Sequence, residues 1–185
     1  MTQLNLLLMN GSLRGGSHNR KLVIEAARLF DATPIMADLD LPLYNGDIEE
    51  RDGIPGQVRA LRDQIAVADA VAISTPEYNQ SLSGVLKNAL DWVSRAGENP
   101  WANKPVAIMS AAAGRAGGAR AQYALRLALN PFQPRLITGP EVMVARAGTE
   151  FDREGRLTGE PYQKALTALM GKLKADAKNA AKMGV

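Results

Sequence analysis

The chain has 185 residues, of which 46% are hydrophobic and 22% charged, and this predicts one globular domain over residues 1–185. The absence of cysteine excludes disulfides, thiol catalysis and cysteine-ligated clusters, and the single histidine argues against a metal site. The net charge of +3 comes from scattered Lys and Arg residues with few aromatics among them, which argues against nucleic-acid binding. Since no apolar run is long enough to cross a membrane and no signal peptide is evident, a cytoplasmic protein is expected.

Apolar runs typical of buried strands alternate with helical patterns through the whole chain. The predicted strands are Leu4–Met9, Pro34–Ala37, Ala70–Ser74, Val106–Ser110 and Glu141–Val144. The predicted helices are Asn19–Phe30, Pro55–Ala68, Gly84–Arg95, Ala119–Leu129 and Pro161–Lys182. Asp38–Gly53, rich in Asp, Glu, Pro and Gly, is predicted to be a long polar loop. This alternation indicates an α/β three-layer sandwich, whose five-stranded parallel sheet has the flavodoxin-like order 2-1-3-4-5 with helices on both faces.

The segment Gly11–Asn19 directly follows the first predicted strand and has the features of a phosphate-binding loop. Gly11 allows a sharp turn, and the Gly15-Gly16 pair allows backbone amides to approach an anion closely. Arg14 adds a permanently charged guanidinium, and the start of the following helix favours a phosphate by roughly 0.3–1 kcal/mol. Short polar side chains complete the loop: Ser12, Ser17 and Asn19.

Two familiar phosphate motifs do not fit this loop. His18 follows Ser17 where a P-loop requires Lys and then Ser or Thr, and Ser12-Leu13 interrupt a dinucleotide-binding Gly-x-Gly-x-x-Gly pattern. The alternative interpretation is a turn rich in Gly and Ser that leads into a helix capped by Ser17 or Asn19. In that case His18 is a residue of the helix start rather than a ligand.

A second polar segment, Thr75–Asn79, directly follows the third predicted strand. Pro76 restricts Thr75 to an extended conformation, and the backbone of the next three residues then offers amides and carbonyls to a planar ring. The alternatives are a solvated carboxylate at Glu77 and a packing role for Tyr78. Ligands of such sheets bind beyond the carboxyl ends of the strands, at the switch between the first and third strands. The two segments together therefore predict a phosphorylated aromatic cofactor.

Three motifs make the chain resemble a known family. They are Gly11-Ser12-x-Arg14-x-x-Ser17-x-Asn19, then Pro76-Glu77-Tyr78-Asn79-x-Ser81-x-x-Gly84-x-Leu86-Lys87-Asn88-Ala89-Leu90-Asp91-Trp92, and Gly114-x-x-Gly117-Gly118-Ala119-Arg120. With them the sequence from Leu4 to about Val144 resembles the NAD(P)H-dependent FMN reductases, and within these the bacterial quinone and chromate reductases. The chain departs from the family pattern at Gln80, at Leu82-Ser83 and in the run Ala111–Ala113, which bears on acceptor access and ring packing.

The resemblance implies a flavodoxin-like fold that binds FMN non-covalently and uses NADH or NADPH as co-substrate. Around the phosphate it places residues of the first loop: Ser12, Arg14, Ser17 and Asn19. His18, which lies between the last two, is a further cofactor-binding candidate. Around the isoalloxazine ring and the ribityl chain it places residues of the second loop: Pro76, Glu77, Tyr78 and Asn79. The third motif and the strand before it add three cofactor-binding candidates, Ser110, Gly114 and Arg115. The alternative for Arg115 is an ordinary surface arginine.

The implied function is two-electron hydride transfer by a ping-pong mechanism, from NAD(P)H through FMN to a small-molecule electron acceptor. Quinones, free flavin, ferric complexes and chromate are the candidate acceptors. The flavin carries the chemistry, so no catalytic residue is expected, and Arg115 is the alternative candidate for such a role. A flavodoxin-type electron carrier without NAD(P)H activity is the main alternative, although such carriers are typically acidic and this chain is basic. A non-catalytic FMN-binding regulator is a further alternative.

Two predicted helices are apolar over more of their circumference than one core face requires. In Gly84–Arg95 the apolar residues spread over an arc of roughly 160°, beyond the ~100° stripe of a surface helix. In Ala119–Leu129 the apolar residues are interrupted only by two arginines and a glutamine. A homodimer or homotetramer with these helices at its interface is therefore expected, and a broad intramolecular core is the alternative.

Overall fold

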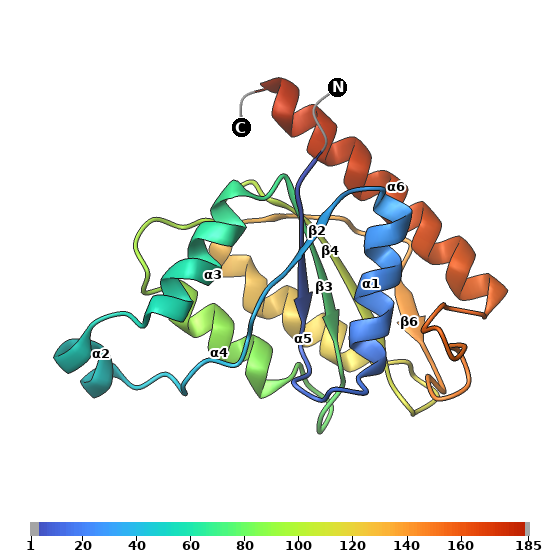
Figure 1. Ribbon diagram of the computed structural model, residues 1–185, viewed down its shortest axis with the longest axis horizontal. Coiled ribbons are helices and arrows are strands. Elements are labelled where there is room, and N and C mark those ends of the chain that lie inside the picture. Colours follow the sequence, from blue (N-terminus) through green and yellow to red (C-terminus); the bar gives the residue numbers. More distant parts are fainter. Residues whose placement is uncertain (1–3, 184–185) are drawn as a thin grey trace.

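In the computed structural model, which describes residues 4–183, the strands form one parallel sheet (Figure 1). Its order is β2-β1-β3-β4-β5, and β6 also pairs with β4. The strands are β1 (Leu6–Asn10), β2 (Pro34–Met36), β3 (Ala70–Thr75), β4 (Pro105–Ala111), β5 (Arg135–Leu136) and β6 (Val142–Val144). The predicted doubly wound fold and its 2-1-3-4-5 order are confirmed. Of the predicted domain, residues 1–3 and 184–185 lie outside the described residues.

The central strands β1, β3 and β4 are covered on both faces, which explains their continuous apolar sequences. The register pairs Leu6 with Ala70 and Asn10 with Ser74, and it pairs Thr75 with Ser110. The three strands therefore end at the same edge of the sheet. The loops that follow them are brought together there, as the sequence predicts for a ligand site.

Helices cover both faces of the sheet and produce two separate cores (Figure 1). One core contains residues of α1 and α6, and the other contains residues of α3, α4 and α5. No helix within residues 4–183 is long and apolar enough to span a membrane. The helices are α1 (His18–Phe30), α2 (Gly46–Asp52), α3 (Gly56–Val67), α4 (Gly84–Val93), α5 (Ala119–Leu129) and α6 (Glu160–Met183).

The fifth position of the sheet is filled by two short strands rather than one. Both β5 and β6 pair in parallel with β4, the first near its start and the second near its end. The sequence predicts the second piece but misses β5, a two-residue strand that is only half-buried. Between the two pieces lies the cis peptide Gly139-Pro140. A proline donates no hydrogen bond to a ladder, so the strand is interrupted there.

The predicted long loop Asp38–Gly53 is wrong in one part, because it contains the helix α2. Asn45 caps this helix, with its side-chain oxygen accepting a hydrogen bond from the Asp47 amide at 2.9 Å. Before the helix, the chain crosses α4: the indole nitrogen of Trp92 donates to the Pro42 carbonyl at 2.7 Å. The ring of Tyr44 lies edge-on to Trp92, with 5.0 Å between ring centroids. This segment therefore covers part of the wide apolar arc of α4 within the same chain.

Candidate functional site

An open cleft of about 290 Å³ lies where the loops after β1, β3 and β4 meet. It brings together eight of the predicted site residues, namely Ser12, Arg14, Ser17, His18, Asn19, Pro76, Glu77 and Tyr78. The sequence-based site leaves out four further lining residues, Gly16 and the run Ala111–Ala113. The other predicted residues do not line the cleft: Asn79, Ser110, Gly114 and Arg115. Gly16 is part of the glycine pair and Ala111–Ala113 is a departure from the family pattern, but small side chains without polar atoms do not mark themselves as ligand contacts.

The first loop turns sharply after β1 and is held on both sides. The Gly11 amide donates to the Ser74 carbonyl at 2.9 Å, which ties the loop to the end of β3. A Cβ at Gly11 would lie 2.6 Å from Leu86 Cδ1, so any larger residue would force the Leu86 side chain of α4 to shift. Ser17 caps α1, because its hydroxyl accepts a hydrogen bond from the Arg20 amide at 3.2 Å.

Several backbone amides of this loop are free to bind an anion. Within the described residues, the N–H groups of Gly15, Gly16, His18 and Asn19 donate to no protein acceptor. The guanidinium of Arg14 forms no ion pair there either. Free amides at the start of a helix carry a partial positive charge, and an unpaired arginine adds a full one. This arrangement is suited to a phosphate group.

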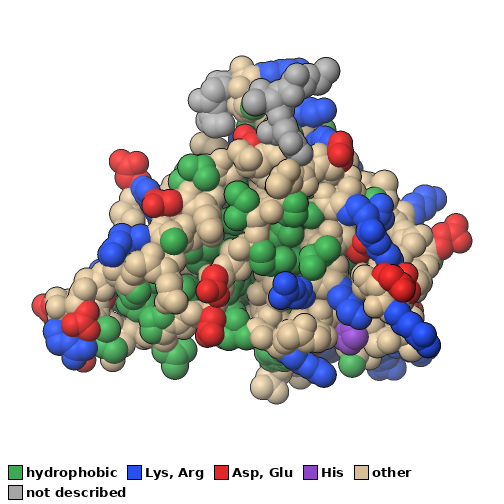
Figure 2. All heavy atoms as spheres, in the orientation of Figure 1, with side chains coloured by type: hydrophobic (Ala, Val, Ile, Leu, Met, Phe, Trp, Pro, Cys, Tyr) green, Lys and Arg blue, Asp and Glu red, His purple; other side chains and the backbone are tan. Residues whose placement is uncertain are grey.

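The ring of His18 stacks on Phe151 with 5.9 Å between centroids. Its Nδ1 is buried and makes no hydrogen bond to any residue that the structure describes. Figure 2 shows the one histidine side chain among Lys and Arg side chains. Burial and the charges of Lys21 and Arg14 lower the pKa of His18 below its usual value. An anion in the cleft would accept a hydrogen bond from this ring and offset the nearby positive charges.

Asn19 contributes to the site in a different way from the one that its polar side chain suggests. The side-chain oxygen accepts hydrogen bonds from the Ser74 hydroxyl at 2.8 Å and the Ala111 amide at 2.9 Å. The side-chain nitrogen donates to the Ala111 carbonyl, also at 2.9 Å. Asn19 thus joins the ends of β3 and β4 beneath the cleft, and its free backbone amide is the group left for a ligand.

The second loop is a tight hairpin. Tyr78 and Ser81 exchange both backbone hydrogen bonds, at 3.2 and 3.1 Å, so Asn79 and Gln80 form the two-residue turn. Both turn residues have positive φ, 50° for Asn79 and 65° for Gln80. Tyr78 is 52% exposed and lines the cleft, where it is available to a ligand.

Glu77 connects the second loop to the third, a role that its position in a polar loop does not suggest. Its Oε2 accepts hydrogen bonds from the backbone amides of Arg120 at 3.0 Å and Ala121 at 3.4 Å, in the first turn of α5. The Arg120 side chain lies 3.4 Å from the other carboxylate oxygen. The carboxylate therefore caps α5 and fixes the loop that precedes this helix.

The third loop is packed closely against β4. The fully buried Ser110 hydroxyl donates to the Gly117 carbonyl at 2.6 Å and accepts from Gln122 Nε2 at 2.8 Å. Gly118 has a φ of 91°, and a Cβ there would lie 2.7 Å from Ser110 Cβ. Ser110 thus holds the loop rather than lining the cleft, whereas Gly114 and Arg115 are exposed. The ligand-binding roles of these three residues stay predictions.

Comparison with known proteins assigns the chain to a family. Residues 4–149 match the family model described as NADPH-dependent FMN reductase. The chain belongs to this family. It is 46% identical over 157 residues to an NAD(P)H-dependent FMN reductase of Pseudomonas aeruginosa, and the match covers 83% of this chain and 84% of the relative. It is 40% identical over 180 residues to a quinone reductase of Escherichia coli, and the match covers 94% of this chain and 93% of the relative.

Solved structures agree with this assignment. The flavoenzyme NAD(P)H:(acceptor) oxidoreductase of Paracoccus denitrificans superposes with a TM-score of 0.85 at 32% identity, covering 95% of this chain and 98% of that one. An NADH:FMN oxidoreductase at 18% identity shows the same fold, with a TM-score of 0.72. Membership of the FMN reductase family confirms the expectation of an oxidoreductase with FMN as cofactor and NAD(P)H as co-substrate.

The residues present in the cleft fit FMN. The free amides of the first loop and the unpaired Arg14 give the cleft groups that suit a phosphate. The same cleft is lined by Tyr78, Pro76 and the small side chains of Ala111–Ala113, which suit a flat aromatic ring. A phosphorylated flavin requires both kinds of group.

Proposed function

We propose that this FMN reductase transfers two electrons from NADH or NADPH to small oxidised acceptors by a ping-pong mechanism. The observation that carries the proposal is the open cleft in which the phosphate loop and the exposed Tyr78 ring line the same cavity. Bound FMN would supply hydride acceptance and release there. Quinones are the first acceptors to test, since relatives of the chain are quinone reductases, and free flavin, ferric complexes and chromate follow.

The chain's own residues bind and orient the cofactor in this proposal. Ser12, Arg14, Ser17, His18 and the amide of Asn19 hold the phosphate. Pro76 and Tyr78 position the ring directly, Asn79 acts through the turn that follows Tyr78, and Glu77 acts through its cap on α5. Ser110 is a positioning residue for the third loop, while Gly114 and Arg115 would stabilise negative charge at the polar edge of the ring.

Steady-state kinetics test this function. If donor and acceptor use the same open face in turn, double-reciprocal plots against NAD(P)H at several quinone concentrations should be parallel. The product should be the two-electron hydroquinone. Intersecting lines would indicate a ternary complex with a separate acceptor site. An FMN-loaded protein that does not oxidise NADH or NADPH would instead support the electron-carrier alternative.

The proposal includes the localisation and the oligomeric state of the protein. A reductase that draws on the NADH and NADPH pools is expected to work in the cytoplasm, and fractionation of the native host tests this. We also infer a homodimer or homotetramer, because α5 exposes Tyr123 and Leu127 on one face.

A further inference from the structure

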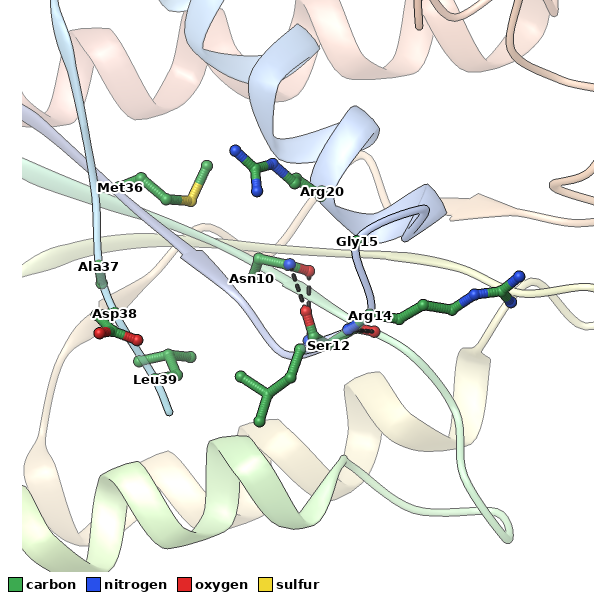
Figure 3. Close-up of a pocket in the computed structure, with 10 residues that line it drawn as sticks. Asn10, Ser12, Arg14, Gly15, Arg20, Met36, Ala37, Asp38 and Leu39 are labelled. Atoms are coloured by element: carbon green, nitrogen blue, oxygen red, sulfur yellow. Dashed lines mark hydrogen bonds between the residues drawn. The ribbon is translucent and has the colours of Figure 1, made fainter. Parts of the chain in front are cut away.

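A second cavity, also of about 290 Å³, lies on the other side of the phosphate loop (Figure 3). It is formed between the loop after β1 and the segment after β2, and it shares Ser12 and Arg14 with the flavin cleft. Its volume is near the lower end of the range of about 300–1,000 Å³ for small-molecule pockets. The cavity therefore suits a group the size of one nucleotide.

Two opposite charges line this cavity without pairing. Within residues 4–183, neither Arg20 of α1 nor Asp38 forms an ion pair. One carboxylate oxygen of Asp38 accepts a hydrogen bond from the Asp40 amide at 3.0 Å, and the other has no partner. In Figure 3 the guanidinium of Arg20 extends towards Met36, while the Arg14 side chain points away from both. Arg20 and Asp38 are therefore both available to a ligand.

The chemistry of these groups matches an adenosine 5′-phosphate. A guanidinium binds phosphate oxygens, and a carboxylate accepts hydrogen bonds from the two hydroxyls of a ribose. Met36 and Leu39 add apolar surface for a flat base. In dinucleotide-binding α/β folds, an acidic residue some twenty positions beyond the first loop binds the ribose of the adenosine. Asp38 stands in a comparable place, just beyond the end of β2 at Met36.

We propose that this cavity is an adenylate site, which binds the adenosine 5′-phosphate part of a nucleotide beside the flavin cleft. Two sources share this chemistry. FAD would place its riboflavin phosphate in the cleft and its adenylate across Ser12 and Arg14, and NAD(P)H would place its adenosine end in the cavity. The existence of the site is independent of the proposed function, whereas the assignment of NAD(P)H as the source depends on it.

The test is calorimetric titration of AMP into the protein saturated with FMN. Wild type should bind AMP, Arg20→Ala should weaken binding at least tenfold, and Asp38→Asn should weaken it several-fold. Arg153→Ala and Asp47→Asn are matched controls, since they remove exposed charges elsewhere and should bind AMP as wild type does. FMN affinity should stay unchanged in all four variants. Adenosine without its phosphate should bind more weakly than AMP.

Three results would contradict the proposed adenylate site: no AMP binding at millimolar concentration, equal AMP affinity in wild type and both cavity variants, or AMP binding that FMN abolishes.

Further measurements on the same samples identify which nucleotide supplies the adenylate. If FAD is the source, Arg20→Ala weakens the binding of FAD but not the binding of FMN. If NAD(P)H is the source, Arg20→Ala raises KM for NADH without lowering kcat. Loss of NAD(P)H oxidation in wild type would contradict the proposed function and leave the AMP result unaffected.

Discussion

Arg14 lines the cleft with an exposed guanidinium that has no protein partner among the described residues. Its replacement by alanine should therefore weaken FMN binding while leaving the free protein as stable as before. A charge-assisted hydrogen bond contributes about 1.5–3 kcal/mol, which corresponds to a loss of affinity of ten- to more than a hundredfold. Flavin fluorescence titration measures the affinity, and thermal unfolding without flavin measures the stability. Arg153→Ala is the control, and unchanged FMN affinity in Arg14→Ala would place Arg14 outside the site.

His18 gives a direct spectroscopic signal, because it is the single histidine of the chain. Burial and the positive charges of Lys21 and Arg14 hold its pKa below the usual value in the free protein. A bound phosphate group opposes both charges and favours the protonated ring, so FMN should raise this pKa. By linkage, FMN should bind more tightly as the pH falls through the His18 titration.

Proton NMR of the imidazole ring follows this titration with and without FMN. Riboflavin, which lacks the phosphate, is the matched ligand control and should move the midpoint less. An identical midpoint with FMN, with riboflavin and without ligand would show that His18 does not face the phosphate.

Individual site residues differ in how much of their role the sequence predicts. The phosphate loop is predictable because glycines, serines and an arginine directly after a buried strand indicate anion binding from a short stretch of sequence. The partners of Glu77 and Asn19 are not predictable in this way. Glu77 caps a helix that begins 42 positions later, at Ala119, and Asn19 binds the backbone at Ala111. Such contacts depend on the packing of the whole fold, and a sequence motif alone cannot distinguish them from contacts to a ligand.

At the scale of elements, an ion-pair cluster joins α1 to the loop between β6 and α6. The carboxylate of Glu25 is almost fully buried and binds Arg28 at 3.1 and 3.2 Å and Arg156 at 2.8 Å. Burial alone would raise the pKa of Glu25, but the hydrogen bonds and charges of Arg28 and Arg156 outweigh it and lower the pKa. Because the pKa is lower in the folded than in the unfolded state, the charged cluster stabilises the fold above the unfolded pKa of about 4.3. This contribution is lost as the pH falls through the folded pKa.

Arg156→Ala should therefore destabilise the protein by about 1–2 kcal/mol at neutral pH, a value reduced for the half-exposed arginine. The difference from wild type should shrink only as the pH falls below the unfolded pKa and through the lowered pKa of folded Glu25. Urea unfolding at pH 7, 5 and 3.5 measures the effect, with Arg153→Ala as the control. A difference that stays constant over this pH range would mean that Arg156 acts through packing and not through Glu25.

The elements themselves are largely predictable, and the exceptions have physical causes. The central strands and the long helices follow from continuous apolar runs and from helical periodicity, and α5 has the predicted bounds Ala119–Leu129. The helix α2 buries none of its residues, so no apolar stripe marks it. The strand β5 has two half-buried residues, which is too short for any periodicity to show. Elements that bury little leave little signal in the sequence.

At the scale of the whole molecule, the two helices expected at a subunit interface differ. The segment before α2 already covers part of α4, whose Trp92 and Val93 are fully buried within one chain. The intramolecular alternative therefore accounts for most of the apolar arc of α4. On α5, however, Tyr123 and Leu127 are 57% and 71% exposed, and residues four positions apart lie on the same face of a helix. The prediction of a homo-oligomer now depends on α5.

Light scattering at micromolar concentration should give a mass that is a multiple of the 19.8 kDa monomer. Leu127→Lys places a charge on the exposed face of α5 and should shift the mass towards 19.8 kDa, because burial of an unpaired charge in an interface is strongly unfavourable. Val67→Lys is the matched control, since Val67 is 68% exposed on a different helix, α3. Both variants should keep the circular dichroism of wild type, because neither side chain contributes to a core. A wild-type mass of 19.8 kDa would contradict the homo-oligomer, and an unchanged oligomer in Leu127→Lys would move the interface away from α5.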